Sequence, residues 1–173
     1  MVKITRSKLE STVVNLFLDI LRTNLEDTKS TPRVNKNWIR SQEQIRNDTP
    51  DPNKRQTIKN SEFVGYPEVI VEAFQSKAKQ KTTYVSTNVN YENECELTIR
   101  IKDVGSVVNT GNLGSQIEDV LESKRSTFML GGITKLEWSN INTGNYASDN
   151  NEYNERQIIC TFIARTSSWQ TGR

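Results

Sequence analysis

The chain has 173 residues, a length typical of one domain with its own core, although only 34% of them are hydrophobic. Twenty-three basic residues oppose 21 acidic ones, so the formal net charge is only +2. A protein whose main task is to wrap nucleic acid usually carries a strong basic excess or a basic stripe, so the charge balance argues against electrostatic capture of nucleic acid as the main role. We predict a single domain spanning residues 1–173.

Residues 7 to 25 have the spacing of an amphipathic helix. Apolar side chains recur every three or four positions along this segment: Leu9, Val13, Leu16, Phe17, Ile20 and Leu21. Ser7 followed by Glu10 matches a capping box, which would satisfy free N–H groups at the helix start. We expect this helix to pack against a sheet.

Residues 26–62 form a long polar stretch, which we expect to be a loop. Loops of this length within a small domain are usually functional or disordered. Within it, the segment Asn37–Arg40 has the composition of a short strand. Trp38 is either an anchor for a partner protein or a lid on the domain's own core, and the sequence leaves both alternatives open.

Three segments between residues 67 and 102 have strand composition. Pro67 suits the first position of a strand that runs to Phe74, and residues 82–89 resume the same composition. Between them, we expect the basic segment Lys77–Lys81 to be a solvated turn. Apolar and polar residues alternate in Cys95–Lys102, which predicts a sheet with one covered and one polar face.

A second helix is predicted after these strands. Asn109–Asn112 supplies turn and cap residues, the apolar residues between Leu113 and Phe128 keep helical spacing, and Gly131 with Gly132 ends the helix.

The remaining residues predict two more strands. Ile133–Ile141 alternates, residues 142–155 are expected to be a polar loop, and Arg156–Arg165 is apolar on both faces, as in the middle of a sheet. The tail, residues 166–173, is expected to fray. The predicted fold is therefore α+β, with a mainly antiparallel sheet of about four to five strands and two helices packed on one face.

The cysteines and the chain's hydropathy set further expectations. Cys95 and Cys160 each lie in a predicted strand among apolar neighbours, so we expect reduced core thiols rather than a disulfide. No run of 18 apolar residues occurs, so no membrane contact is expected. The first residues lack the apolar run of a signal peptide, so we expect synthesis in the cytoplasm.

The residues offer little support for catalysis. Histidine is absent, which removes the commonest general base and metal ligand. Acidic residues cluster near positions 92–94, 118–122 and 149–155, each interleaved with basic or amide residues as on an ordinary surface. Gly111–Gly114 lacks the pattern of a phosphate-binding loop and is better explained as a helix cap. We expect no enzyme activity, no cofactor and no metal.

The order of these elements resembles that of tail terminator or tail completion proteins of tailed viruses. The resemblance rests on the segment Tyr66–Glu72, which opens the sheet after a helix and a polar loop, and on the later strands and helix. It implies a structural virion protein forming a ring, commonly of six copies, that ends the tail tube and contacts the neck or connector protein. DNA would pass through the lumen without specific binding.

If the ring hypothesis holds, aromatic and polar side chains outside the predicted core are candidates for contacts with other subunits or with the tube. These candidates are Trp38, Arg40, Asn145, Tyr146, Tyr153 and Trp169. Two alternatives remain. One is another neck or tail component, such as a head-completion, stopper or tube protein. The other is a nucleic-acid-binding module that uses Tyr84, Tyr91 and Arg100 on an exposed sheet face.

Overall fold

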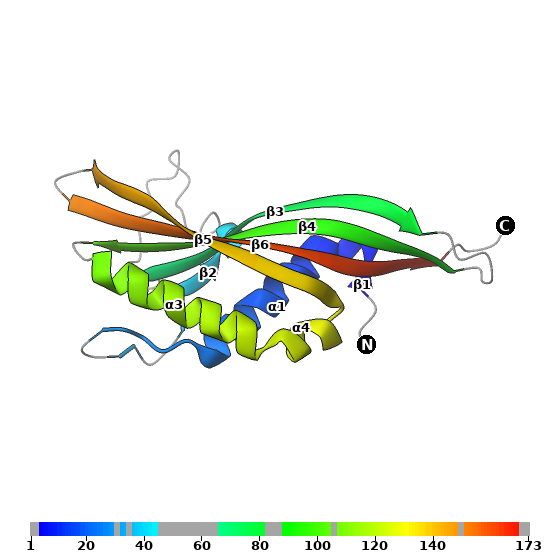
Figure 1. The fold of residues 1–173 in the computed structure, drawn as a ribbon, viewed down its shortest axis with the longest axis horizontal. Coiled ribbons are helices and arrows are strands. Elements are labelled where there is room, and N and C mark those ends of the chain that lie inside the picture. The colour runs from blue at the N-terminus through cyan, green and yellow to red at the C-terminus, as the bar shows by residue number, and fades with distance from the viewer. Residues whose placement is uncertain are drawn as a thin grey trace, which may run out of the picture.

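A computed structural model of the chain describes residues 4–29, 32–33, 36–44, 66–81, 88–104, 107–148 and 151–169. These residues form one elongated mixed sheet, curled into a half-barrel, with the helices gathered on one side of it (Figure 1). The elements, in chain order, are β1 (Ile4–Thr5), the 3-10 helix η1 (Arg6–Lys8), α1 (Leu9–Asn24), β2 (Ile39–Ser41), β3 (Glu68–Lys81), β4 (Asn88–Val104), α3 (Val107–Ser123), α4 (Arg125–Leu130), β5 (Ile133–Ser148) and β6 (Asn151–Trp169). A single helical turn, residues 42–44, follows β2.

The sheet corrects the predicted fold. The described residues contain six strands in the order β1-β6-β4-β3-β2, with β5 also paired to β6. Both β1 and β2 run parallel to their neighbours, so the sheet is mixed. The prediction of four to five antiparallel strands with two helices is therefore wrong. It failed because β1 has only two residues, too few for a strand pattern to show in the sequence, and because a local pattern does not reveal that β1 and β2 join the sheet in parallel.

The strand β6 lies in the middle of the sheet, as its apolar sequence predicts. It pairs with β4 along its length, from Tyr153 to Trp169. On its other side it pairs first with β5 and then, at Thr166 and Ser167, with β1. Because β6 has hydrogen-bonded neighbours on both edges, it is a central strand of the sheet, as is β4.

The strands are longer than the sequence predicts. Lys77–Lys81, expected to be a turn, continues β3 opposite Asn90–Glu94. Residues 142–148 and 151–155, expected to be a loop, are the paired ends of β5 and β6, and residues 166–169 of the expected tail belong to β6. Residues 82–87, predicted as a strand, lie outside the described part. These segments were predicted as turn, loop or tail because they are polar. The ends of the strands extend away from the helices, where strands need not alternate apolar and polar residues (Figure 1).

The hydrophobic core lies between the inner face of the sheet and the helices. In β4, Cys95, Leu97, Ile99 and Ile101 are all buried, which confirms the predicted alternation. The stripe on α1 is also confirmed, except that Leu16 is only partly buried and Leu18 joins the core. The predicted capping box is wrong, because Lys8 occupies the N-cap and no side chain caps the helix; Ser11 Oγ donates to the Lys8 carbonyl instead.

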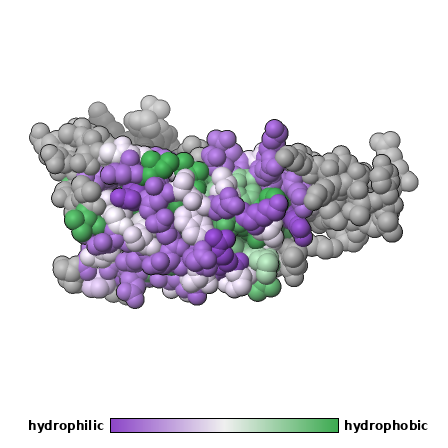
Figure 2. All heavy atoms as spheres, in the orientation of Figure 1, coloured by the Kyte–Doolittle hydropathy of each residue, from purple (hydrophilic) through white to green (hydrophobic). Residues whose placement is uncertain are grey.

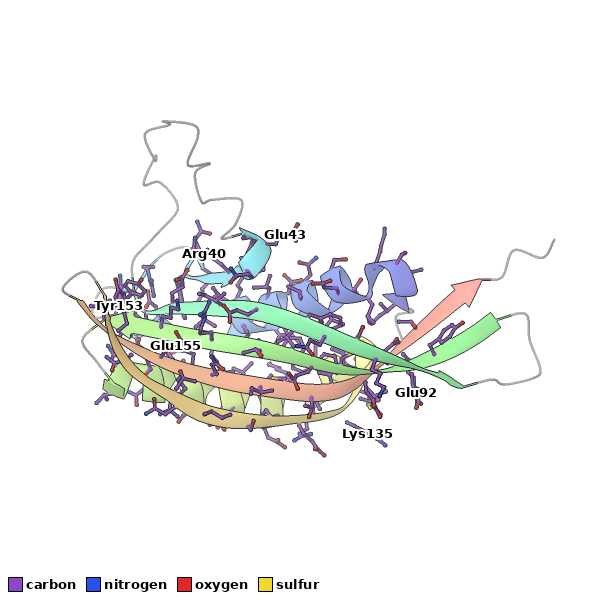
Figure 3. All side chains as sticks on the ribbon, turned by 90° about the horizontal axis from the view of Figure 1, so that it is seen from above. Arg40, Glu43, Glu92, Lys135, Tyr153 and Glu155 are labelled. Atoms are coloured by element: carbon purple, nitrogen blue, oxygen red, sulfur yellow. The ribbon has the colours of Figure 1, made fainter. Side chains whose placement is uncertain are left out.

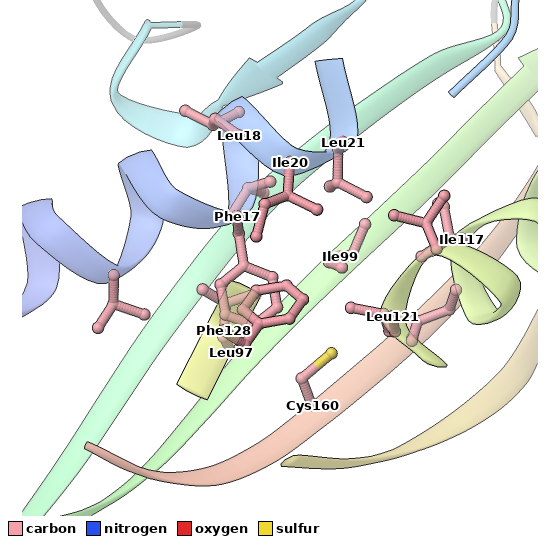
Figure 4. Packing of buried hydrophobic residues seen from close by; sticks show 14 of the residues in the cluster. Phe17, Leu18, Ile20, Leu21, Leu97, Ile99, Ile117, Leu121, Phe128 and Cys160 are labelled. Carbon is pink, nitrogen blue, oxygen red and sulfur yellow. The ribbon is translucent and has the colours of Figure 1, made fainter. Parts of the chain in front are cut away.

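Three phenylalanines join the helices to the sheet. The ring of Phe17 on α1 lies 4.7 Å from that of Phe128 on α4 and 5.6 Å from that of Phe162 on β6, between ring centroids. Figure 4 shows Phe17 and Phe128 in contact above Leu97, within the layer between α1 and the sheet. Such tilted aromatic pairs add to the stabilisation from buried area.

The second predicted helix is divided into α3 and α4 at Lys124. Gly131 and Gly132 end it, as expected, and Gly132 has a positive φ of 92°. However, Gly111 and Gly114 lie inside α3, so their interpretation as a cap is wrong. Gly114 instead allows the side chain of Arg156 to approach, since a Cβ there would lie 2.8 Å from Arg156 Cδ.

The polar stretch after α1 contains a compact, buried turn rather than loop alone. The short strand expected at Asn37–Arg40 exists but is shifted to Ile39–Ser41, where β2 pairs with β3 in parallel. Trp38 is 1% exposed, with the Arg33 guanidinium 4.8 Å from its ring centroid. Arg33 in turn donates to both carboxylate oxygens of Asp27 and to the carbonyl of Pro67. Residues 45–62 of this stretch lie outside the described part.

Candidate assembly surfaces

The outer face of the sheet, opposite the helices, carries a cluster of ion pairs across four adjacent strands. Arg40 on β2 pairs with Glu68 on β3. Arg100 on β4 pairs with Glu72 on β3 and lies 3.8 Å from Glu155 on β6. The strand register explains this meeting, since Arg40, Ile70 and Arg100 occupy one row across the sheet.

These ion pairs are largely shielded from solvent. Ile70, between the two arginines, is only 3% exposed although it faces away from the core. The side chains of Glu68 and Arg40 are 7% and 11% exposed. Pairs this buried fix strand register more than they add stability, because the cost of desolvating the charges offsets much of the attraction.

The six residues predicted to contact other subunits lie in different parts of the fold. Trp38 is in the core, which favours the second of its two alternatives, and Arg40 is already paired with Glu68. Tyr153 packs edge to face on Tyr66, with ring centroids 5.7 Å apart. Figure 3 shows Tyr153 at the end of the sheet where β5 and β6 meet, at a distance from Glu92 and Lys135 at the other end.

The other three candidates are placed by their backbone alone. Asn145 and Tyr146 lie on β5 opposite Asn154 and Tyr153, so the structure brings these candidates together on one hairpin. Trp169 ends β6 opposite Asn88, toward the opposite end of the sheet. The side chains of Asn145, Tyr146 and Trp169 lie outside the described part. The six residues therefore do not form one surface.

The alternative of a nucleic-acid platform does not gain support from the sheet. Tyr91 and Arg100 both lie on β4, which pairs with β6 without a register shift, so their side chains point to opposite faces. Arg100 is also neutralised by Glu72 and Glu155. Tyr84 lies outside the described residues. Tyr91 and Arg100 therefore do not combine into a single stacking surface.

Among the side chains that the structure describes, exposed apolar ones are scattered rather than gathered. The large ones are Val108, Met129, Leu130 and Ile141. Figure 2 shows the described apolar residues on one face as separate small patches within a polar surface. Met129 and Leu130 are adjacent at the end of α4, but two residues are a small area for a stable interface.

Two hollows were not anticipated from the sequence. One, of about 570 Å³, lies across β3, β4, β6 and β5 and is lined by Lys77, Glu94, Glu96 and Lys135, among others. The second, of about 780 Å³, lies between the first half of α1 and β3. The positions of the two hollows depend on strand register and on where β2 ends. The sequence pattern gives no signal for strand register or for the end of β2.

Among the described residues, the titratable groups whose pKa is clearly shifted are buried in the fold and contribute to its structure. Burial raises the pKa of the Cys95 thiol to about 11 and that of Cys160 to about 12. Both cysteines are free and buried, which confirms the expectation of reduced core thiols. Within the described part of the chain, no three His, Cys, Asp or Glu residues are grouped as metal ligands would be.

Comparison with known proteins gives no family. No protein-family model matches the chain, and no curated protein matches its sequence. Of the helices described, none has the length and apolar character needed to cross a membrane.

Proposed function

We propose that the chain is a structural virion protein that assembles into a ring at the end of a tail tube, next to the neck of the particle. The observation that carries the proposal is the uneven cover of the sheet. The helices pack on one side of its middle, whereas the ends of β3, β4 and β6 extend past the ends of both α1 and α4 as an arm (Figure 1).

The strand residues of this arm are mostly polar in sequence, as in Lys77–Lys81 and Asn90–Glu94. A strand pair without a covering layer is marginally stable in water, and further packing is what stabilises it. Contacts between copies in a closed ring would supply that packing without any second protein. The proposal also takes support from the resemblance in element order described above.

Native mass tests the proposal directly. Six copies of the 19.8 kDa chain would give a particle of about 119 kDa, six times the mass of one chain. We expect this mass for the protein alone or when it is mixed with a tail-tube protein, with rings visible by negative-stain electron microscopy. A chain that stays monomeric at high concentration and does not bind the tube would refute the ring.

A different neck or tail component is the second candidate. Stacking on an already assembled connector, with no ring of the protein alone or on the tube, would favour a head-completion or stopper role.

A further inference from the structure

The hollow between α1 and β3 lies along an open edge of the sheet. We call it the edge groove; its lining includes Glu10 and Val14 of α1, Gln42 and Glu43 of the turn after β2, and Glu72 and Phe74 of β3. It holds about 780 Å³. Figure 3 shows Glu43 on the turn that follows the strand of Arg40, at the side of the sheet next to α1.

Among the described residues, the edge of β3 beyond β2 has no strand neighbour. The strand β2 pairs with β3 only at Val69–Val71, yet β3 continues to Lys81. Among the described strands, none pairs with this edge after Val71. A bulge between Val71 and Phe74 marks the point where β2 ends and the groove begins. Unpaired N–H and C=O groups on such an edge accept an additional strand.

The other long edge of the sheet is better protected. On β5, register shifts occur between Thr134 and Glu137 and between Asn142 and Gly144. Arg125 of α4 also donates to the carbonyl of Leu136 on β5. Bulges and side chains of this kind commonly block strand addition. The edge of β3 has one bulge, at Val71–Phe74, and its register with β4 then continues unbroken to Lys81, so it is the better template.

The groove is rich in hydrogen-bond acceptors and negative charge. It is lined by three carboxylates, those of Glu10, Glu43 and Glu72, and by no Lys or Arg side chain. Glu10 and Glu43 are exposed, whereas Glu72 is paired with Arg100. Gln42 Oε1 is buried without a hydrogen-bond donor. Val14 and Phe74 add apolar surface between these groups.

We propose that the edge groove binds an extended, basic segment of a partner protein, which adds to β3 as a new strand in line with β2. Its backbone would pair with the free edge of β3, as in other cases of strand addition. Alternate side chains would face α1, where an apolar residue meets Val14 and a Lys or Arg meets Glu10. Basic residues near the turn would meet Glu43 and the unpaired Gln42 oxygen.

This inference goes beyond the ring and does not depend on it, because the groove lies within one chain. Its charge disfavours nucleic acid, whose phosphates the exposed carboxylates of Glu10 and Glu43 would repel. A basic peptide segment is the occupant whose charge and backbone both fit.

The test uses the whole chain and a synthetic peptide, acetyl-Lys-Val-Arg-Ile-Lys-Val-Lys-amide, labelled with a fluorophore. We expect saturable binding by fluorescence anisotropy that weakens as salt rises. Two further peptides carry N-methyl groups on alternate backbone nitrogens, one peptide for each edge of the strand. Because N-methylation removes the donors of a strand ladder, at least one of the two should lose binding. Equal binding of all three peptides would overturn strand addition.

A charge-reversal variant tests the location. We expect Glu10→Lys with Glu43→Lys to weaken binding about tenfold or more. The matched control, Asp119→Lys with Glu137→Lys, makes the same change of net charge at exposed positions outside the groove and should change affinity less than about twofold. Circular dichroism checks that both variants fold. Equal weakening in both variants would overturn the site.

Native mass of the same variants shows whether the groove is occupied by a second copy of this chain instead of a partner protein. Wild-type pairs that disappear only in the Glu10→Lys, Glu43→Lys variant would mean that a second copy fills the groove, which overturns the partner assignment. A peptide that fails to bind while rings of about 119 kDa form would overturn this inference and leave the ring proposal standing.

Discussion

Asp27 offers the sharpest test of how the turn after α1 is stabilised. Its carboxylate is 2% exposed and lies 2.6 Å from Arg33 Nε. It also accepts hydrogen bonds from the backbone N–H groups of Arg33 and Lys29. Burial alone would raise the pKa of Asp27, but these hydrogen bonds and the Arg33 charge outweigh burial and lower the pKa from 3.8 to about 2.

The lowered pKa converts into a pH-dependent stability. A difference of roughly two units between the unfolded and folded chain corresponds to about 2.5 kcal/mol, at about 1.4 kcal/mol per unit. Because the folded pKa is the lower one, this stabilisation is fully present above about pH 5. It is lost as the pH falls through 4 toward 2. Asp27→Asn should therefore lower the free energy of unfolding by 2 kcal/mol or more at pH 7, since it also leaves the Arg33 guanidinium without its anion.

Urea unfolding at several pH values between 7 and 2, followed by tryptophan fluorescence, measures this difference. The gap between wild type and Asp27→Asn should shrink by about 2 kcal/mol between pH 5 and pH 2. Asp19→Asn, an exposed position on α1, is the matched control and should show a small gap at every pH. A gap for Asp27→Asn that does not change with pH would refute the reasoning.

Three other predictions follow from burial and backbone geometry. Trp38→Ala should lower the free energy of unfolding by about 3–5 kcal/mol in urea titrations, because the side chain is fully buried; a stable monomer that fails only in assembly would instead support the partner-anchor alternative. Cys95 and Cys160 should stay unmodified by a thiol-reactive disulfide reagent at pH 8 until the chain unfolds, since burial keeps both thiols protonated; fast labelling of the native protein would contradict this. Gly132→Ala should cost about 1 kcal/mol, because φ there is 92°, and an unchanged melting temperature would show that the turn adapts.

The parts of the fold that bury apolar surface were predictable from the sequence. Alternation in Cys95–Lys102 and the stripe on α1 report directly which side chains face the core. Where strands leave the core, this signal stops. Lys77–Lys81 and the paired residues of β5 and β6 near Asn145 are polar, yet they continue as strands because their backbones have partners across the hairpin.

The candidate sites were less predictable, because they depend on where elements end relative to one another. Trp38 stands alone in a polar stretch, and only the tertiary contacts of Arg33 and β3 reveal that it belongs to the core. The edge groove arises because β2 ends at Ser41 while β3 continues. Neither length is encoded in a local pattern.

The central place of β6 has a consequence for how the protein is made. During translation β4 and β5 leave the ribosome before β6, and until then each lacks the neighbour that its longest ladder requires. A nascent chain stopped before residue 151 would expose two long unpaired edges, a state prone to aggregation. The sheet can therefore fold correctly only after residues 151–169 have been synthesised. Until β6 pairs with them, β4 and β5 keep exposed edges that promote aggregation.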